Sequence, residues 1–302
     1  MQPIELGRMR VHKVHEMESP TPMAMQLPGV TPADLARLAA WYDPGDGEIG
    51  PTIEQSRMTF AVHSWVIEVD GQVILIDTCD GNHKDRMVPE VNQLNTDYLG
   101  NLKRAGFTPE DVDLVMCTHL HFDHVGWNTR LEGGKWVPTF ANAKYLFGRR
   151  DFEYFKAEPP SEAVHLASFL DSVVPVMEAG QGIIVDEDHV AHREIGNGVW
   201  LQPAFGHSPG CCTIHAQADS REAIFWGDVI HHPVQLIRPD LPFAFDADPA
   251  AASLTRQRVM RRAAEEELLC FPAHFRKTSA GQVIPDGEAY RYRFLGESVG
   301  RQ

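Results

Sequence analysis

Apolar and polar positions alternate along the chain in ways that predict strands and helices in turn. From Met58, the segment MTFAVHSWVIEV, an Asp-Gly turn and the segment QVILID predict a β-hairpin whose second strand ends at Asp77. A helical pattern from about Asn95 to Ala105, stopped by a glycine, precedes the apolar strand LVMC. These segments form a strand–helix–strand unit.

The alternation continues toward the C-terminus. We expect a short helix at RRDFEYF, a longer one from Ser161 to about Val174 that ends before Pro175, and another from about Pro249 to Glu267. The other segments have apolar strand patterns: AKYLFG, GIIVDE, VWLQPAFG, CTIHAQ, AIFWGD, LLCFPAHF and VIP…YRYRFL. The chain has no internal repeat and no low-complexity tract, so the simplest layout is two β-rich halves with helices outside.

The N-terminal segment differs from the rest of the chain. Residues from Met1 to about Val14 have the pattern of an edge strand, and the stretch from Ser19 to Pro51 is rich in proline and glycine around a short helical pattern. We interpret residues 1–57 as a strand and an arm or lid packed on a main domain of residues 58–302, in a single-domain protein. The arm could equally form a homodimer contact.

Composition narrows the class of protein. At 302 residues and 43% apolar content the chain can bury a large core, and a formal net charge of −15 argues against nucleic acid as a partner. No signal-peptide core and no membrane-spanning apolar run is visible, so we expect a cytoplasmic protein without a membrane partner. Five cysteines, two of them adjacent at Cys211 and Cys212, argue against a disulfide framework. We assign the adjacent pair to packing.

The sequence THLHFDH directly follows the strand LVMC and carries four metal-capable side chains within six residues. Alternate residues at a strand end point the same way, so His119 and His121 can reach one ion, while the turn carries Asp123 and His124 toward a second. The alternative is four polar side chains that each find a separate partner at a strand end.

Three later segments supply further ligands at or near strand ends. They are GHSPG with His207, GD with Asp228, and AHF with His274. Each histidine alone would more often be structural, but the set provides what a two-ion site requires. An aspartate that bridges two ions is a natural role for Asp228.

The order of HxHxDH, GHSPG, GD and AHF resembles the metallo-β-lactamase superfamily, and HLHFDHVGWN is similar to its lactonase-like branch. The resemblance implies an α/β fold, an αββα sandwich of two sheets packed face to face with helices outside. It also implies two ligand sets bridged by Asp228: His119, His121 and His207 for one metal, and Asp123, His124 and His274 for the other. Asp77 matches an aspartate that supports the histidine cluster without binding metal.

Departures from the family pattern narrow the assignment. Cys79 replaces the usual glycine after IDT, and Cys211 follows GHSPG where many members carry histidine. Dizinc β-lactamases with a cysteine ligand need cysteine at the position of Asp228, and glyoxalase II relatives have a longer helical end after the position of His274. Both groups are therefore disfavoured.

The site implies hydrolysis. Two divalent ions would share a hydroxide that attacks a lactone or small carboxylic ester, with Asp123 and Asp228 as the catalytic carboxylates and Asp123 moving the proton to the leaving group. Zinc suits the nitrogen and oxygen donors best, although iron, manganese or cobalt would also bind. Phosphotriester or phosphodiester hydrolysis and β-lactam or amide cleavage on the same site are alternatives. A di-iron redox protein and a non-catalytic metal-binding protein are alternatives from other classes.

Candidates for contacts with a small-molecule substrate are less specific. Trp127 and Asn128 follow the metal turn, and His231 and His232 follow Asp228; we favour His232 of the last two, although each could be structural. An apolar wall could come from residues that otherwise fill the core: Met23, Met25, Leu27 and Phe243 to Phe245.

Overall fold

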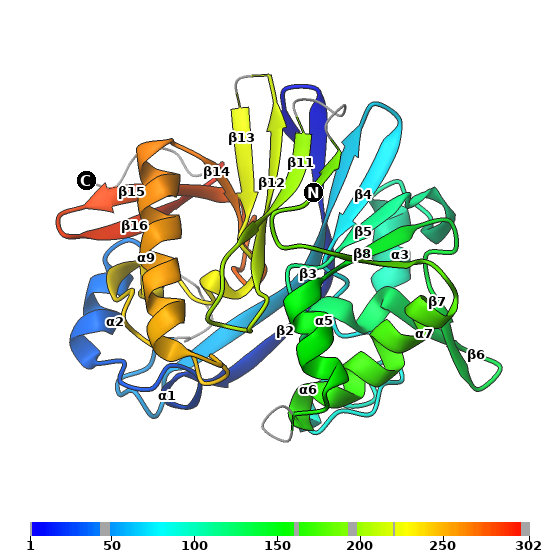
Figure 1. The fold of residues 1–302 in the computed structure, drawn as a ribbon. Helices are drawn as coiled ribbons and strands as arrows, with labels where there is room; N and C mark the ends of the chain where they lie inside the picture. Colours follow the sequence, from blue (N-terminus) through cyan, green and yellow to red (C-terminus); the bar gives the residue numbers. More distant parts are fainter. Residues whose placement is uncertain (1, 43–48, 160–162, 193–197, 220, 297–302) are drawn as a thin grey trace.

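The structure is a computed structural model that describes residues 2–42, 49–159, 163–192, 198–219 and 221–296. Within these residues, two seven-stranded sheets form the centre of the molecule and helices cover both outer sides (Figure 1). The expected αββα sandwich is confirmed.

The first sheet comes from the N-terminal half of the chain, in the order β1-β2-β3-β4-β5-β8-β9. Its strands are β1 (Ile4–Leu6), β2 (Met9–Pro22), β3 (Arg57–Val69), β4 (Gln72–Ile76), β5 (Leu114–Met116), β8 (Lys144–Gly148) and β9 (Gly182–Val185). Strands β1 to β4 are antiparallel, whereas β4, β5, β8 and β9 are parallel. The carboxyl ends of β4 and β5 therefore meet at one edge, where Asp77 and the THLHFDH segment follow.

The second sheet is built from the C-terminal half, in the order β10-β11-β12-β13-β14-β15-β16. Its strands are β10 (Val190–His192), β11 (Gly198–Pro203), β12 (Cys212–Ala218), β13 (Arg221–Phe225), β14 (Leu269–Phe271), β15 (Gly281–Asp286) and β16 (Ala289–Phe294). Strands β13 and β14 are parallel neighbours, so Asp228 and His274 follow adjacent strand ends. A separate hairpin, β6 (Thr129–Glu132) and β7 (Lys135–Pro138), projects beside the first sheet (Figure 1).

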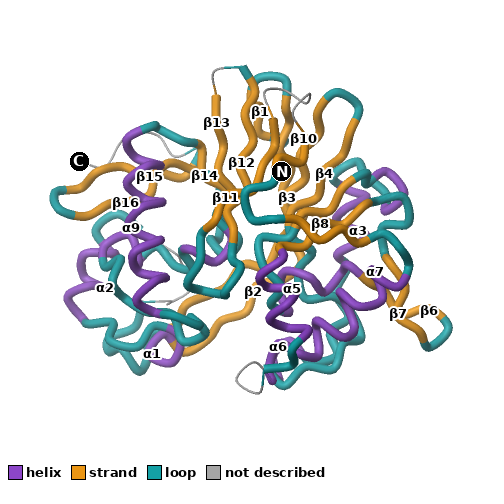
Figure 2. Tube along the Cα trace, viewed as in Figure 1, coloured by secondary structure: helices purple, strands orange, loops and turns teal. Residues whose placement is uncertain are grey.

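Three hydrophobic clusters hold the layers together. Side chains of both sheets, among them Trp65, Phe225 and Phe271, fill the space between the sheets. The outer face of the first sheet is covered by α3 (Tyr98–Arg104), α5 (Arg149–Lys156) and α7 (Val174–Glu178), and α6 (Ala163–Ser168) lies on the same side of the molecule. The second is covered by α2 (Pro32–Ala39), α8 (Val234–Ile237) and α9 (Pro249–Glu265). Figure 2 shows α2 and α9 on one flank of the strands and α3, α5, α6 and α7 on the opposite flank.

Short helical turns occupy several of the connections between these elements. They are α1 (Met23–Gln26), α4 (Phe122–Val125), the 3-10 turns Pro89–Val91, Pro109–Asp111, Gly126–Asn128 and Gly227–Val229, and the π turn Phe169–Val173. None of the described helices is long and apolar enough to cross a membrane. All five cysteines are buried and unpaired, as expected from their number and spacing.

The expected helix from Ser161 to Val174 does not stop before Pro175. Position 161 lies outside the described residues; from Ala163 the helix passes through the π turn and continues to Glu178. Pro175 lies in the first turn of α7, where its missing N–H is not needed for an intrahelical bond. A proline can begin a new helical segment as well as end one.

The N-terminal segment is more regular than its composition suggested. Strand β2 runs to Pro22 and pairs with β3 along its length, so the expected arm begins later than Ser19. Beyond it, Met23, Leu27 and Leu38 pack in the cluster on the outer face of the second sheet. The segment thus links the first sheet to the opposite helical layer.

Candidate metal centre

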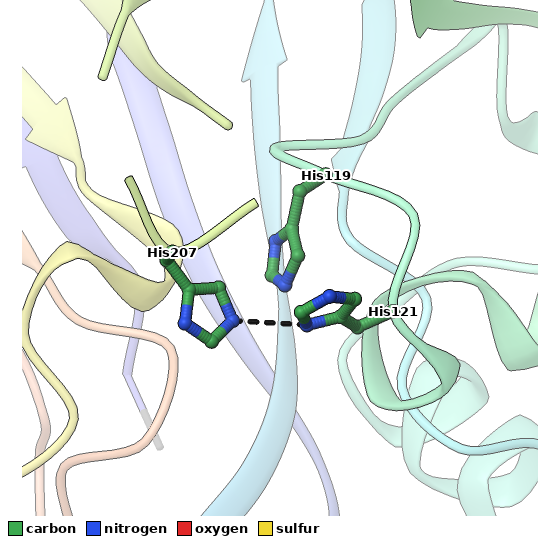
Figure 3. A group of neighbouring side chains, drawn as sticks. All are labelled: His119, His121 and His207. Carbon is green, nitrogen blue, oxygen red and sulfur yellow. Dashed lines mark hydrogen bonds between the residues drawn. The ribbon is translucent and has the colours of Figure 1, made fainter. Parts of the chain in front are cut away.

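Two loops bring three imidazoles together: the loop that follows β5 and the loop that precedes β12. His119, His121 and His207 are buried, and one ring nitrogen of each lies within 4.8 Å of the others. Figure 3 shows the three rings converging from the two halves of the molecule. Nε2 of His207 and Nδ1 of His121 are only 2.9 Å apart. Such a set of facing nitrogens is suited to a metal ion.

A second group lies beside the first and contains Asp123, His124, Asp228 and His274. Nε2 of His274 is 2.9 Å from Oδ1 of Asp228 and 3.5 Å from Oδ2 of Asp123. Nε2 of His124 is 3.1 Å from Oδ1 of Asp228. The residues expected at the second ion are therefore adjacent in space.

Asp228 lies between the two groups. Its Oδ1 faces the second group, and its Oδ2 is 3.2 Å from Nε2 of His207 and 3.8 Å from Nε2 of His119. Gly227 has φ +51°, and a Cβ there would lie 2.7 Å from Oγ1 of Thr118, so only glycine lets the two loops approach this closely. The carboxylate thus faces both candidate ion positions.

The donor set fits divalent cations. Nε2 of His119, of His124 and of His274, with Oδ1 of Asp228, are buried and have no hydrogen-bond partner among the described residues. Orphaned buried polar atoms are costly and rare, and here they point at one another, which is the arrangement that metal ligands require. Burial lowers the pKa of His207, but the carboxylates of Asp228 and Asp246 outweigh it and raise that pKa to about 9. A cation would take the place of this proton.

Carboxylates behind the histidines fix how their rings point. Asp77, at φ +53°, accepts hydrogen bonds from the backbone N–H of Thr118 at 2.8 Å and from Nδ1 of His124 at 2.9 Å. The fully buried carboxylate of Asp246 lies 3.1 Å from Nδ1 of His207. Each contact leaves Nε2 free to face the centre. Asp77 therefore lies where the sequence pattern predicted a supporting aspartate.

Asp151 ties two ligand loops together. Its carboxylate accepts hydrogen bonds from Oγ of Ser208 at 2.7 Å, from N of Gly210 at 2.5 Å and from N of Leu120 at 3.3 Å. The GHSPG turn and the HLH segment are thus bonded to the same buried side chain. Burial raises the pKa of Asp151 to about 6 even though these hydrogen bonds lower it.

A cavity of about 150 Å³ lies over the centre. His121, Asp123, His207 and Asp228 line it, and most of its remaining wall is apolar. Of the residues proposed for an apolar wall, Met25, Phe243 and Phe245 line the cavity, whereas Met23 and Leu27 are buried in the core. The space suits a substrate with a hydrophobic body.

The three weaker pocket candidates do not line this cavity. Trp127 donates its indole N–H to Glu16 at 2.5 Å, and Oδ1 of Asn128 accepts a hydrogen bond from Thr78 at 2.9 Å. Nδ1 of His232 accepts a hydrogen bond from the backbone N–H of Val234 at 3.2 Å. These contacts are structural.

The neighbouring histidine is closer to the centre. Nε2 of His231 is 3.2 Å from Oδ2 of Asp228, and its ring stacks on Phe243 at 3.6 Å. It forms a further possible ligand group with His207 and Asp228. Of the two histidines that follow Asp228, His231 is thus the one at the site.

Sequence reasoning missed other residues of the site. His165, on α6, lines the cavity and stacks on the ring of His121 with 3.7 Å between centroids. Asp80 also lines the cavity, and Asp246 supports His207. None of them belongs to a spaced motif; the only signal for His165 was a histidine in a predicted amphipathic helix.

The fold and the cluster define the class of metal-dependent hydrolases built on a double-sheet sandwich. The chain belongs to the Metallo-beta-lactamase superfamily, whose family profile matches residues 57–274. This agrees with the resemblance drawn from the HxHxDH, GHSPG and GD segments.

Individual relatives are distant. An N-acyl homoserine lactonase of Bacillus thuringiensis is 23% identical over 261 residues, which cover 85% of this chain and 90% of the relative. The N-acyl homoserine lactonase AiiB of Agrobacterium fabrum is 30% identical over 89 residues, 25% of this chain and 32% of the relative. Both carry names that fit the lactonase-like branch.

Solved structures share the fold over nearly the whole chain. The hydrolase AbOPH in the beta lactamase superfamily has a TM-score of 0.80 at 18% identity and covers 98% of both chains. AidC, a dizinc quorum-quenching lactonase in complex with the product N-hexanoyl-L-homoserine, has a TM-score of 0.76 at 18% identity, covering 99% of this chain and 98% of that one. The N-terminal segment is included in both superpositions.

Proposed function

We propose that the protein hydrolyses lactones or other small carboxylic esters with two divalent metal ions, and that zinc is the preferred metal. The observation that carries the proposal is the position of Asp228, which lies between two groups of buried ligand atoms at the floor of an apolar cavity. The names of the N-acyl homoserine lactonases and of the dizinc lactonase support the substrate class and the metal.

The ligand sets would be His119, His121 and His207 for one ion, and Asp123, His124 and His274 for the other, with Asp228 shared. When bound, divalent ions at such a centre lower the pKa of water toward neutrality and polarise a carbonyl oxygen. The nitrogen and oxygen donors suit zinc, and they also accept iron, manganese or cobalt.

We assign the proton transfer to Asp123. Its side chain is 19% exposed, whereas that of Asp228 is 5% exposed, and both residues line the cavity. Its Oδ2 is within 3.6 Å of Nε2 of both His124 and His274. Asp123 can therefore pass a proton to the leaving alkoxide.

The apolar walls of the cavity exclude water from the reaction. Phe60, Phe122 and Phe243 exclude water beside the reacting carbonyl, which strengthens the electrostatic interactions made there. Met25 brings the N-terminal segment to the same cavity, so this segment would cover the substrate.

Elemental analysis and a hydrolysis screen on wild type and Asp228→Ala test the proposal. We expect about two metals per chain, as a two-ion centre requires, and turnover of lactones or aryl esters that is lost in Asp228→Ala but kept in the control Asp113→Ala. Asp113 accepts one backbone hydrogen bond from Val73 just before β5, at the end of that strand opposite to the histidines. Protein without metal, or turnover indifferent to Asp228, would overturn the proposal. Phosphotriesters and β-lactams in the same screen test the alternative reactions.

A further inference from the structure

Asp80 is a buried acid that the metal centre does not use. It lines the cavity three residues after Asp77, its side chain is fully buried, and neither of its carboxyl oxygens has a hydrogen-bond partner among the described residues. It belongs to none of the groups whose ligand atoms converge. A carboxyl group left in this state destabilises the fold unless something binds it.

The backbone around Asp80 is fixed. Its N–H donates to Oε2 of Glu16 at 2.8 Å, and the carbonyl of Cys79 accepts from N of Gly126 at 2.7 Å. A Cβ on Gly126 would lie 1.8 Å from the carbonyl oxygen of Asp80, so the two loops touch. Cys79, at φ +53°, completes the turn in which Asp80 sits. The turn that carries the Asp80 side chain is therefore held between β2 and the loop of Gly126.

Neighbouring charged groups do not satisfy Asp80. Glu16 accepts hydrogen bonds from the side chains of Trp127 and Thr96 as well as from Asp80 N, so it is itself a satisfied carboxylate. Arg86 donates from Nη1 and Nη2 to Asp171 at 2.7 and 3.1 Å. Burial raises the pKa of Asp80 well above its usual range, and the charges of Glu16 and Asp123 add to the effect.

A second unsatisfied acceptor lies in the same cavity. Oε1 of Gln26 is buried without a partner among the described residues. Outside the metal-binding groups, His165 is the third described residue of the lining with an unpartnered buried polar atom: its Nδ1, which donates or accepts according to its tautomer. The spare polar groups of this apolar cavity thus call for hydrogen-bond donors on the ligand.

We propose that Asp80 is a specificity-determining residue that accepts a hydrogen bond from an N–H group of the substrate. The inference rests on the proposed function and narrows its substrates to lactones or esters that carry an N–H donor beside an apolar body. A carboxyl group accepts such a bond whether it is ionised or protonated. The rest of the wall, including Phe60 and Phe245, contacts the apolar body.

A matched pair of substrates tests the proposal. The first is a γ-butyrolactone with an acylamino group next to the carbonyl, and the second has a methylene in place of the N–H. We expect wild type to prefer the first by about tenfold or more in kcat/KM. Asp80→Leu should remove this preference and Asp80→Asn should keep part of it, since an amide oxygen still accepts. Glu90→Gln, which changes an exposed acid on the same cavity, should keep the wild-type preference.

Binding separates recognition from turnover. Calorimetry on the zinc-loaded protein uses the corresponding cyclopentanones, which lack the ring oxygen and cannot be hydrolysed as lactones. Tighter binding of the N–H analogue by wild type but not by Asp80→Leu supports the inference, and it does so even if no lactone is turned over, in which case the proposed function fails alone. Equal handling of both members of the pair by wild type overturns the inference even if lactones are hydrolysed. The inference is also overturned if Asp80→Asn and Asp80→Leu lose the same factor in kcat/KM on both substrates of the pair.

Discussion

Asp77 binds no metal in the proposed site, and yet its replacement by asparagine is expected to empty one of the two ion positions. One carboxylate oxygen accepts from the backbone N–H of Thr118, and the other accepts from Oγ1 of Thr118 at 2.9 Å and from Nδ1 of His124 at 2.9 Å. Asparagine keeps the first contact and tolerates the φ of +53°. Its NH₂ group cannot accept from Nδ1–H.

The consequence for His124 sets the size of the effect. With an NH₂ group facing Nδ1, the ring must carry its proton on Nε2, the nitrogen that faces Asp228 at 3.1 Å. That tautomer has no lone pair to offer a metal. Loss of a carboxylate behind a ligating histidine lowers metal affinity by about 10- to 100-fold. The ring nitrogens of His119, His121 and His207 do not contact Asp77 directly. Only His119 is linked to it, through Oγ1 of Thr118.

The assay is zinc titration against a competing chelator. We expect wild type to bind two ions, and Asp77→Asn to keep one near wild-type affinity and to lose the other by about 10- to 100-fold. Asp113→Asn is the control, because Asp113 also accepts from a backbone N–H beside a strand of the same sheet but contacts no histidine. Two ions bound by Asp77→Asn with wild-type affinity would refute the reasoning, as would equal weakening of both.

Three further perturbations test the surroundings of the site. Removal of metal by a chelator should lower the melting temperature by about 5 °C in scanning calorimetry, since bound ions satisfy the orphaned ligand atoms; an unchanged transition would contradict the fit of this site to metal. In the metal-free protein, the raised pKa of Asp151 means that between pH 3.8 and about 6 the folded state keeps a proton that the unfolded state releases. The stabilisation that this proton provides is complete below pH 3.8, the usual pKa of an aspartate, and is lost as the pH rises through the folded-state pKa of about 6. Asp151→Asn stays neutral, so its free energy of unfolding in urea should rise by about 3 kcal/mol relative to that of wild type when the pH is raised from 4 to 7. If the difference in unfolding free energy between the two proteins does not change with pH, the reasoning is contradicted. Arg256→Leu should cost about 3–5 kcal/mol, because buried Arg256 bonds the carbonyls of Val229, Pro239 and Leu241 and lies 3.5 Å from Asp246. The exposed Arg261→Leu serves as its control, with an expected change within about 0.5 kcal/mol, and equal effects of the two substitutions would count against a structural role for Arg256.

The sequence predicted the sheets and the clustered ligands for a physical reason. Short apolar strands that end in metal-capable residues are visible locally, and parallel neighbours place such ends side by side. His119, Asp228 and His274 could therefore be assigned to one edge of the sandwich before any packing was known. The two-residue spacing in HLH likewise indicated that the side chains of His119 and His121 point in the same direction.

Other features depended on contacts between distant segments. Glu16 lies on β2, yet it fixes Asp80 and Trp127, and no local pattern relates these positions. Trp127 follows the metal turn and was proposed for the pocket, but its indole N–H is directed to Glu16 and its ring stacks on Tyr98. His165 reaches the cavity only because α6 packs beside α4. Spacing along the chain cannot reveal such partners.

The site also depends on how the two sheets are fixed to each other, since its ligands come from both. The backbone N–H of Cys212, which begins β12, donates to the carbonyl of Thr118 at 2.8 Å, directly before His119. The N–H of Ala61 on β3 donates to the carbonyl of His274 at 3.1 Å. Each bond joins one sheet to a ligand loop of the other. Because these bonds are made at the ligand residues or next to them, the distances between ligands of the first sheet and ligands of the second are set by the inter-sheet packing and do not depend on loop conformation alone.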